Sequence, residues 1–177
     1  MDTHDASLLV GTPALEALLA ALARGLQARG WRLAVAESCT GGLIAATCTS
    51  VAGSSLWFER GFVTYSNEAK TELLGVPREL IERHGAVSRE VALAMAAGAL
   101  RHSGAQLAVA VTGIAGPDGG SATKPVGTVW FGFACKGEQN ILEAEQALLP
   151  GDRGQVRSAA TMHALARLAA LVPGVTG

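Results

Sequence analysis

Two short apolar runs, each followed at once by a turn of glycines and small polar residues, constrain the fold of this chain most. The first run, Arg32 to Ala36, leads into residues 37–42, and the second, Leu107 to Thr112, leads into residues 113–120. Short apolar runs bounded by turn residues predict buried strands. Buried strands need helices packed against them, so the sequence predicts an α/β protein.

Capping and stop signals place helices around these strands. Thr12-Pro13 predicts the start of a helix that ends at Gly30, Ser88 predicts the cap of an alanine-rich helix that ends at Gly104, and Asp152 opens a last helix. The remaining pattern predicts a strand over residues 57–65, a short helix capped by Asn67 over 67–74, another helix over 78–83, and two strands over 126–135 and 140–148 joined around 136–137. We therefore expect a three-layer α/β/α sandwich around a mixed sheet, a single domain over residues 13–172 between short tails at 1–12 and 173–177.

Composition narrows the functional classes. A chain of 177 residues with 49% hydrophobic and 16% charged residues suits one packed core. A formal net charge of −1 disfavours nucleic acid and anionic membranes as partners. The three cysteines, Cys39, Cys48 and Cys135, have no CxxC spacing, which argues against disulfides and zinc. With no signal-peptide pattern and no apolar run of about 20 residues, we expect a cytoplasmic protein that does not enter a membrane.

The glycine-rich turn at residues 113–120 matches no standard nucleotide motif. Neither GxGxxG nor GxxxxGK[ST] occurs in the chain. The glycines could still let consecutive backbone N–H groups converge on an anion, or the segment could be an ordinary turn. Composition alone leaves both interpretations open.

Ser38 is a candidate nucleophile because it lies between a strand and a helix. There the N–H groups of Thr40, Gly41 and Gly42 could hold an oxyanion. The alternative is that Ser38 or Thr40 only caps the helix. Cys39 is a rival nucleophile, although an ordinary buried thiol is the simpler interpretation.

The base that would activate Ser38 is less obvious. The chain has no GxSxG motif, and its four histidines lie in a tail or on helices, where surface or packing roles are typical. A desolvated lysine is the alternative. Lys70 and Lys124 are both candidates for that role. Lys124 is the lysine of an SxxK sequence, but Gly120 and Pro125 disfavour the helix that this motif requires.

The start of the last predicted helix carries two cations. Arg153 and Arg157 are four residues apart, so they share one face beside the free N–H groups of the first turn. This arrangement could seat a phosphate, or it could be an ordinary charged helix start with Asp152 as N-cap.

Several segments together resemble the CinA C-terminal family. They are Ala36-Glu37-Ser38-Cys39-Thr40-Gly41-Gly42, residues 53–55 with 62–70, Gly85-Ala86-Val87-Ser88, residues 112–120, Lys124-Pro125-Val126-Gly127-Thr128-Val129 and Gly151-Asp152-Arg153, in the family's order. The likeness is greatest to its single-domain nicotinamide mononucleotide deamidases. Longer members carry a further N-terminal domain resembling molybdopterin-binding proteins, which we expect this chain to lack together with the pyrophosphate hydrolysis ascribed to that domain.

The resemblance implies an enzyme that hydrolyses the carboxamide of nicotinamide mononucleotide to nicotinic acid mononucleotide and ammonia, in pyridine nucleotide salvage, without metal or cofactor. It selects Ser38 as nucleophile and Lys70 as base, with Tyr65 assisting through its hydroxyl. It assigns substrate binding to Thr40, Gly41, Gly42, Thr112, Gly113, Ala115, Gly116 and Arg153, with Arg153 at the phosphate. We also expect a homo-oligomer. The alternative is a nucleotide-binding regulatory module that keeps the pocket without turnover.

Overall fold

The structure, a computed structural model, describes residues 12–136 and 140–172. Its strands form one mixed sheet in the order β2-β1-β3-β4-β5. β1 (Leu33–Glu37) runs parallel to both β2 (Phe58–Val63) and β3 (Leu107–Gly113). β4 (Thr128–Cys135) and β5 (Leu142–Leu148) continue the sheet as antiparallel neighbours, so the predicted pairing of the last two strands is confirmed.

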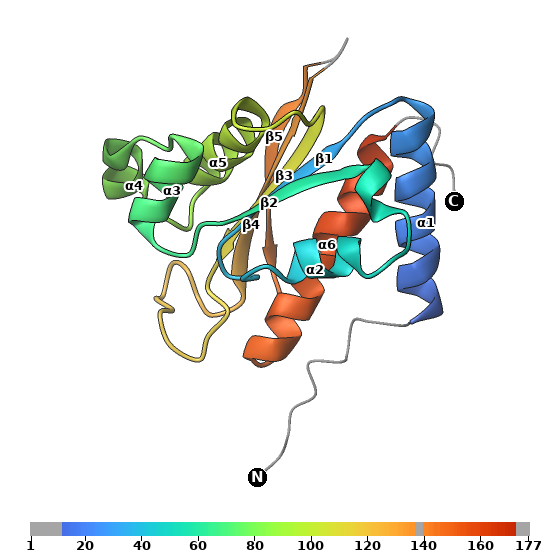
Figure 1. Ribbon diagram of the computed structural model, residues 1–177. Helices are drawn as coiled ribbons and strands as arrows, with labels where there is room; N and C mark the ends of the chain where they lie inside the picture. Colours follow the sequence, from blue (N-terminus) through green and yellow to red (C-terminus); the bar gives the residue numbers. More distant parts are fainter. Residues whose placement is uncertain (1–11, 137–139, 173–177) are drawn as a thin grey trace.

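Helices cover both faces of the sheet (Figure 1). One face carries α1 (Pro13–Ala28), α2 (Leu43–Thr49) and α6 (Arg153–Leu171), and the other carries α3 (Asn67–Leu74), α4 (Arg78–His84) and α5 (Arg89–Arg101). A short 3₁₀ helix, η2 (Ser54–Leu56), precedes β2. The predicted three-layer α/β/α sandwich in a single domain is therefore confirmed.

The two faces of the sheet differ in side-chain size. Leucines and valines of β1 and β3 pack toward α1 and α6 together with Phe131 and Phe133, whereas the alanines of the same strands pack toward α5. Gly132 lies on the small-residue face, and a Cβ there would overlap the carbonyl oxygen of Ala92 in α5. Strict alternation in the strands thus lets α5 approach the sheet closely while the larger core fills the opposite side.

The carboxyl ends of three parallel strands meet at one edge of the sheet. Glu37 at the end of β1 pairs with Val63 of β2 and with Val111 of β3. The backbone N–H of Ser38 donates to the Val111 carbonyl at 2.9 Å, which continues the ladder past the strand. In open α/β sheets this edge is where ligands bind.

Local signals behave largely as expected. The side chains of Thr12 and Ser88 cap α1 and α5 as predicted. The cap of α3 is Ser66 rather than Asn67, because the Ser66 hydroxyl accepts the N–H of Ala69 and Asn67 is already helical. The tails predicted at 1–12 and 173–177 lie outside the described residues, apart from Thr12. Within the described part of the chain, no helix combines the length and apolar character needed to cross a membrane.

Candidate active site

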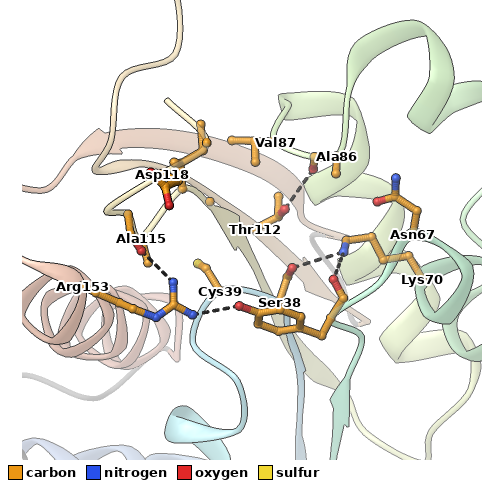
Figure 2. Close-up of a pocket in the computed structure, with 15 residues that line it drawn as sticks. Ser38, Cys39, Asn67, Lys70, Ala86, Val87, Thr112, Ala115, Asp118 and Arg153 are labelled. Carbon is orange, nitrogen blue, oxygen red and sulfur yellow. Dashed lines mark hydrogen bonds between the residues drawn. The ribbon is translucent and has the colours of Figure 1, made fainter. Parts of the chain in front are cut away.

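A pocket of about 260 Å³ opens at the carboxyl edge of the sheet (Figure 2). It brings together most of the site residues expected from the sequence: Ser38, Tyr65, Lys70, Thr112, Gly113, Ala115, Gly116 and Arg153. Ile114, Asp118 and Gly119 belong to the glycine loop expected to line the nucleotide, and Cys39 is the rival nucleophile, whereas Asn67, Ala86 and Val87 were not predicted.

Ser38 and Lys70 meet in the pocket although 32 residues separate them. β1 presents Ser38 at its carboxyl end, and α3 carries Lys70 and Leu74 one turn apart on its buried face. The Lys70 Nζ lies 3.2 Å from the Ser38 Oγ. Ser38 is 9% exposed and Lys70 1%, so the pair lies in a low-dielectric environment.

The Lys70 amine faces a ring of oxygens. Besides Ser38, its Nζ donates to the carbonyl oxygen of Thr64 at 2.9 Å, and it contacts those of Tyr65 at 3.4 Å and Ser66 at 3.3 Å. Burial lowers the pKa of Lys70 from its ordinary 10.5, while the nearby carboxylate of Glu68 acts in the opposite direction. A larger fraction of the Lys70 amine is therefore neutral in the site than in water at the same pH.

Glu37, which sequence reasoning did not assign to the site, shapes the turn that carries Ser38. Its carboxylate accepts the N–H groups of Gly42 at 3.0 Å, Ile44 at 3.1 Å and Ala45 at 2.8 Å. The start of α2 has no other side-chain cap, so neither Ser38 nor Thr40 serves as one. An acidic residue at the end of β1, six residues before α2 begins, was the available signal, because a carboxylate is favoured near a helix N-terminus.

The predicted oxyanion donors require a correction. The N–H of Gly41 donates to the Ser38 carbonyl at 3.0 Å, and that of Gly42 donates to Glu37. Thr40, Gly41 and Gly42 do not line the pocket. These three residues belong to the turn that follows Ser38 and lie outside the pocket lining. The N–H groups of the two glycines already have partners, so they are not available to an oxyanion.

Cys39 lines the pocket but is poorly suited to attack a substrate. The residue is 6% exposed, and burial raises the pKa of its thiol to about 11. A thiol needs to ionise before it becomes a strong nucleophile. The structure therefore favours the hydroxyl of Ser38 over the neighbouring thiol.

Arg153 occupies the other end of the pocket, across Ser38 from Lys70 (Figure 2). Its guanidinium donates to the carbonyl of Gly116 at 2.8 Å and to the Tyr65 hydroxyl at 2.8 Å. Asp152 also caps α6 as expected, with Gln155 completing a capping box. Arg157 does not line the pocket; its guanidinium donates to the Thr40 carbonyl at 2.9 Å.

The Tyr65 hydroxyl therefore contacts Arg153, and no hydrogen bond among the described residues joins it to Ser38 or Lys70. The backbone of Tyr65 reaches the Lys70 amine through its carbonyl oxygen. The proposed help of the hydroxyl to the catalytic pair stays a prediction.

Lys124 lies outside the pocket lining and the SxxK match is not helical. Ser121 and Lys124 lie in a non-helical segment, where the Ser121 hydroxyl accepts the Lys124 N–H at 3.1 Å. The Lys124 amine donates instead to the backbone carbonyls of His84, at the end of α4, and Val87, just before α5. The structure thus brings Lys70, and not Lys124, to the candidate nucleophile.

Comparison with known proteins identifies the family. The CinA C-terminal domain matches residues 15–172. The chain belongs to the CinA C-terminal domain family. It is 56% identical over 151 residues to the nicotinamide-nucleotide amidohydrolase PncC of Enterobacter agglomerans, covering 85% of this chain and 91% of the relative. It is 54% identical over 145 residues to the protein of the same name from Escherichia coli K12, covering 82% and 87%.

A solved structure of the same group has the same fold. The competence/damage inducible protein CihA of Agrobacterium tumefaciens superposes with a TM-score of 0.87 at 44% identity, covering 92% of this chain and 98% of that one. The family resemblance inferred from the motifs is thereby confirmed, and the CinA C-terminal domain described here spans the whole sandwich.

Proposed function

We propose that the protein is a nicotinamide-nucleotide amidohydrolase that converts nicotinamide mononucleotide to nicotinic acid mononucleotide and ammonia. The observation that carries this proposal is the buried contact of 3.2 Å between the Lys70 Nζ and the Ser38 Oγ. Two relatives named nicotinamide-nucleotide amidohydrolase support the same substrate class, and this chain covers more than four fifths of the length of each. A buried serine with a lysine partner is an arrangement suited to acyl transfer.

Lys70 would act as the general base. A neutral amine has two N–H groups and one lone pair. The Thr64 carbonyl, with that of Ser66 or Tyr65, can accept the two N–H groups, which leaves the lone pair for the Ser38 hydroxyl. The three carbonyls thus orient the base as well as solvate it.

The reaction would proceed through an acyl-enzyme. The Ser38 oxygen attacks the carboxamide carbon as its proton moves to Lys70. The protonated lysine then gives this proton to the departing nitrogen, and ammonia leaves as the ester with Ser38 forms. Water attacks the ester with Lys70 again as base, and the acid is released with the serine restored. The positively charged pyridinium ring withdraws electrons from the carboxamide and favours both attacks.

The negative oxygen formed in each attack needs hydrogen-bond donors that are not already in use. The N–H group of Cys39 follows the nucleophile directly, belongs to a residue that lines the pocket, and donates to no oxygen atom of the described residues. We assign it as an oxyanion donor in place of the N–H groups of Thr40, Gly41 and Gly42. Backbone N–H groups held in this way stabilise the transition state without reorganising.

Arg153 would bind the phosphate. Its guanidinium has five N–H groups, of which the Gly116 carbonyl and the Tyr65 hydroxyl each accept one. The remaining N–H groups can donate to phosphate oxygens at the end of the pocket away from Lys70. Thr112, Gly113, Ala115 and Gly116 would line the nucleotide between the two ends. This chemistry fits a cytoplasmic role in pyridine nucleotide salvage.

An ammonia-release assay with nicotinamide mononucleotide tests the proposal against a regulatory module that only binds nucleotides. We expect stoichiometric ammonia and nicotinic acid mononucleotide, and none from Ser38→Ala. Binding of the mononucleotide by calorimetry without any product from the wild-type protein would favour the regulatory module instead.

A further inference from the structure

The segment between α4 and α5 forms one wall of the pocket and has an unusual pattern of hydrogen bonds. Ala86 and Val87 of this segment line the pocket. Four consecutive carbonyl oxygens, from His84 at the end of α4 to Val87, each accept a side-chain donor. The Ser88 hydroxyl donates to Gly85 at 2.8 Å, which is a bond within the segment itself.

The other three bonds come from Thr112 and Lys124, at the two ends of the glycine-rich loop. The Thr112 hydroxyl donates to the Ala86 carbonyl at 2.9 Å (Figure 2). The Lys124 Nζ donates to the His84 carbonyl at 3.1 Å and to the Val87 carbonyl at 2.7 Å. Thr112 and Lys124 flank the glycine-rich loop, of which residues 113–116, 118 and 119 also line this pocket. The loop and the wall are therefore joined at both ends of the loop.

We propose that Lys124 is a positioning residue that holds the wall at Ala86 and Val87 against the glycine-rich loop, and so sets the width of the nucleotide pocket before the substrate binds. The identity of the ligand in this inference rests on the proposed function. The ammonium of Lys124 does not touch the substrate; it acts through the carbonyls of His84 and of the lining residue Val87. A pocket kept at its bound width spares the substrate the cost of ordering both sides.

Lys136 offers a matched control. Its Nζ also donates to a backbone carbonyl, that of Leu100, at 3.0 Å. Lys136 follows Cys135, which pairs with Leu107 at the amino end of β3, so it lies at the edge of the sheet opposite to the pocket. Loss of this bond removes a lysine–carbonyl contact of the same kind without touching the wall.

The experiment compares the full-length wild-type protein with Lys124→Met, Lys124→Arg and Lys136→Met by hydrogen–deuterium exchange of residues 84–88 and by steady-state kinetics with nicotinamide mononucleotide. Lys124→Met should speed exchange in the segment and raise KM at least about tenfold, equivalent to ~1.4 kcal/mol, with kcat within about threefold. Lys136→Met should change neither quantity. Lys124→Arg, which keeps a cationic donor, should restore much of the protection and of the KM.

Equal exchange and equal KM in Lys124→Met and Lys136→Met would overturn the proposal, as would a fall in kcat with unchanged KM. If Lys124→Met does not fold, the Lys124→Arg protein decides, since an unprotected wall there would also refute the role. A wild-type protein that released no ammonia would refute the proposed function, while the exchange data would still decide whether Lys124 holds the wall.

Discussion

The two ends of the pocket differ in how far they are shielded from water. At one end Lys70 and Ser38 are 1% and 9% exposed, and the lysine is surrounded by backbone carbonyls. At the other end Tyr65 is 59% exposed, and Arg153 reaches it over the pocket. Burial changes the proton affinity of an amine, whereas an accessible guanidinium can bind and release an anion without such a change.

This contrast divides the expected kinetic effects. Substitutions at the buried end should act on kcat, because they remove interactions made in the transition state. Substitutions at the exposed end should act on KM, because a phosphate contact is the same in the ground state and the transition state. Each variant below tests whether the division holds.

Ser38→Ala should have the largest effect. It removes the nucleophile, so we expect kcat to fall by at least about 10⁴-fold while the mononucleotide still binds. Cys39→Ala is the matched control at the next position and should keep most of the activity, because the buried thiol takes no part. An active Ser38→Ala beside a folded but inactive Cys39→Ala would reverse the assignment.

Arg153→Ala should raise KM for the mononucleotide with little change in kcat. A charge-assisted hydrogen bond is worth ~1.5 to 3 kcal/mol, which corresponds to roughly 10 to 150-fold. Steady-state kinetics with the mononucleotide measures both constants. A strongly reduced kcat at unchanged KM would show that Arg153 acts in the chemical step. The two ends of the pocket would then not divide into one that sets kcat and one that sets KM.

Tyr65→Phe should have the smallest effect. It removes the hydroxyl that Arg153 contacts but keeps the backbone carbonyl near Lys70. For a change at an exposed position we expect both kcat and KM to stay within about threefold of the wild type. A kcat reduced a hundredfold would show that the hydroxyl assists the catalytic pair, as the family resemblance implies.

Much of the fold could be predicted from the sequence because strand and helix signals were local. The alternation of apolar strands with capped helices predicted the three layers, and the family resemblance selected Ser38 and Lys70, whose side chains the structure brings together. The contacts that refine the site were not predictable in this way. The first N–H groups of any helix lack partners within the helix, so the sequence does not show which side chain accepts them. Only the path of the turn brings the Glu37 carboxylate to the N–H groups of Gly42, Ile44 and Ala45.

The same reason explains the missed wall of the pocket. Ala86 and Val87 carry no functional side chain, and their carbonyls accept hydrogen bonds from Thr112 and Lys124, 26 and 37 residues away. Such long-range bonds from side chain to backbone leave no periodic trace in the sequence. The pairing of Tyr65 with Arg153, 88 residues apart, was hidden for the same reason.

The pH dependence of kcat in the wild type and in Lys70→Arg tests the central claim most directly. An amine of ordinary pKa would be neutral in only about one molecule in a thousand at pH 7.5, and burial lowers the pKa of Lys70 from that value. Because only the neutral form accepts the serine proton, wild-type kcat should rise with pH through one titration whose midpoint lies below pH 10.5.

Arginine keeps the charge but cannot lose its proton at these pH values. We therefore expect kcat of Lys70→Arg to be reduced by about 10² to 10⁴-fold, without the wild-type titration, and Lys70→Met to be similarly inactive. Both variants should keep the wild-type circular dichroism spectrum. A Lys70→Arg enzyme that retained more than about a tenth of the wild-type kcat would contradict the account, since Lys70 would then act as a fixed charge and not as the base.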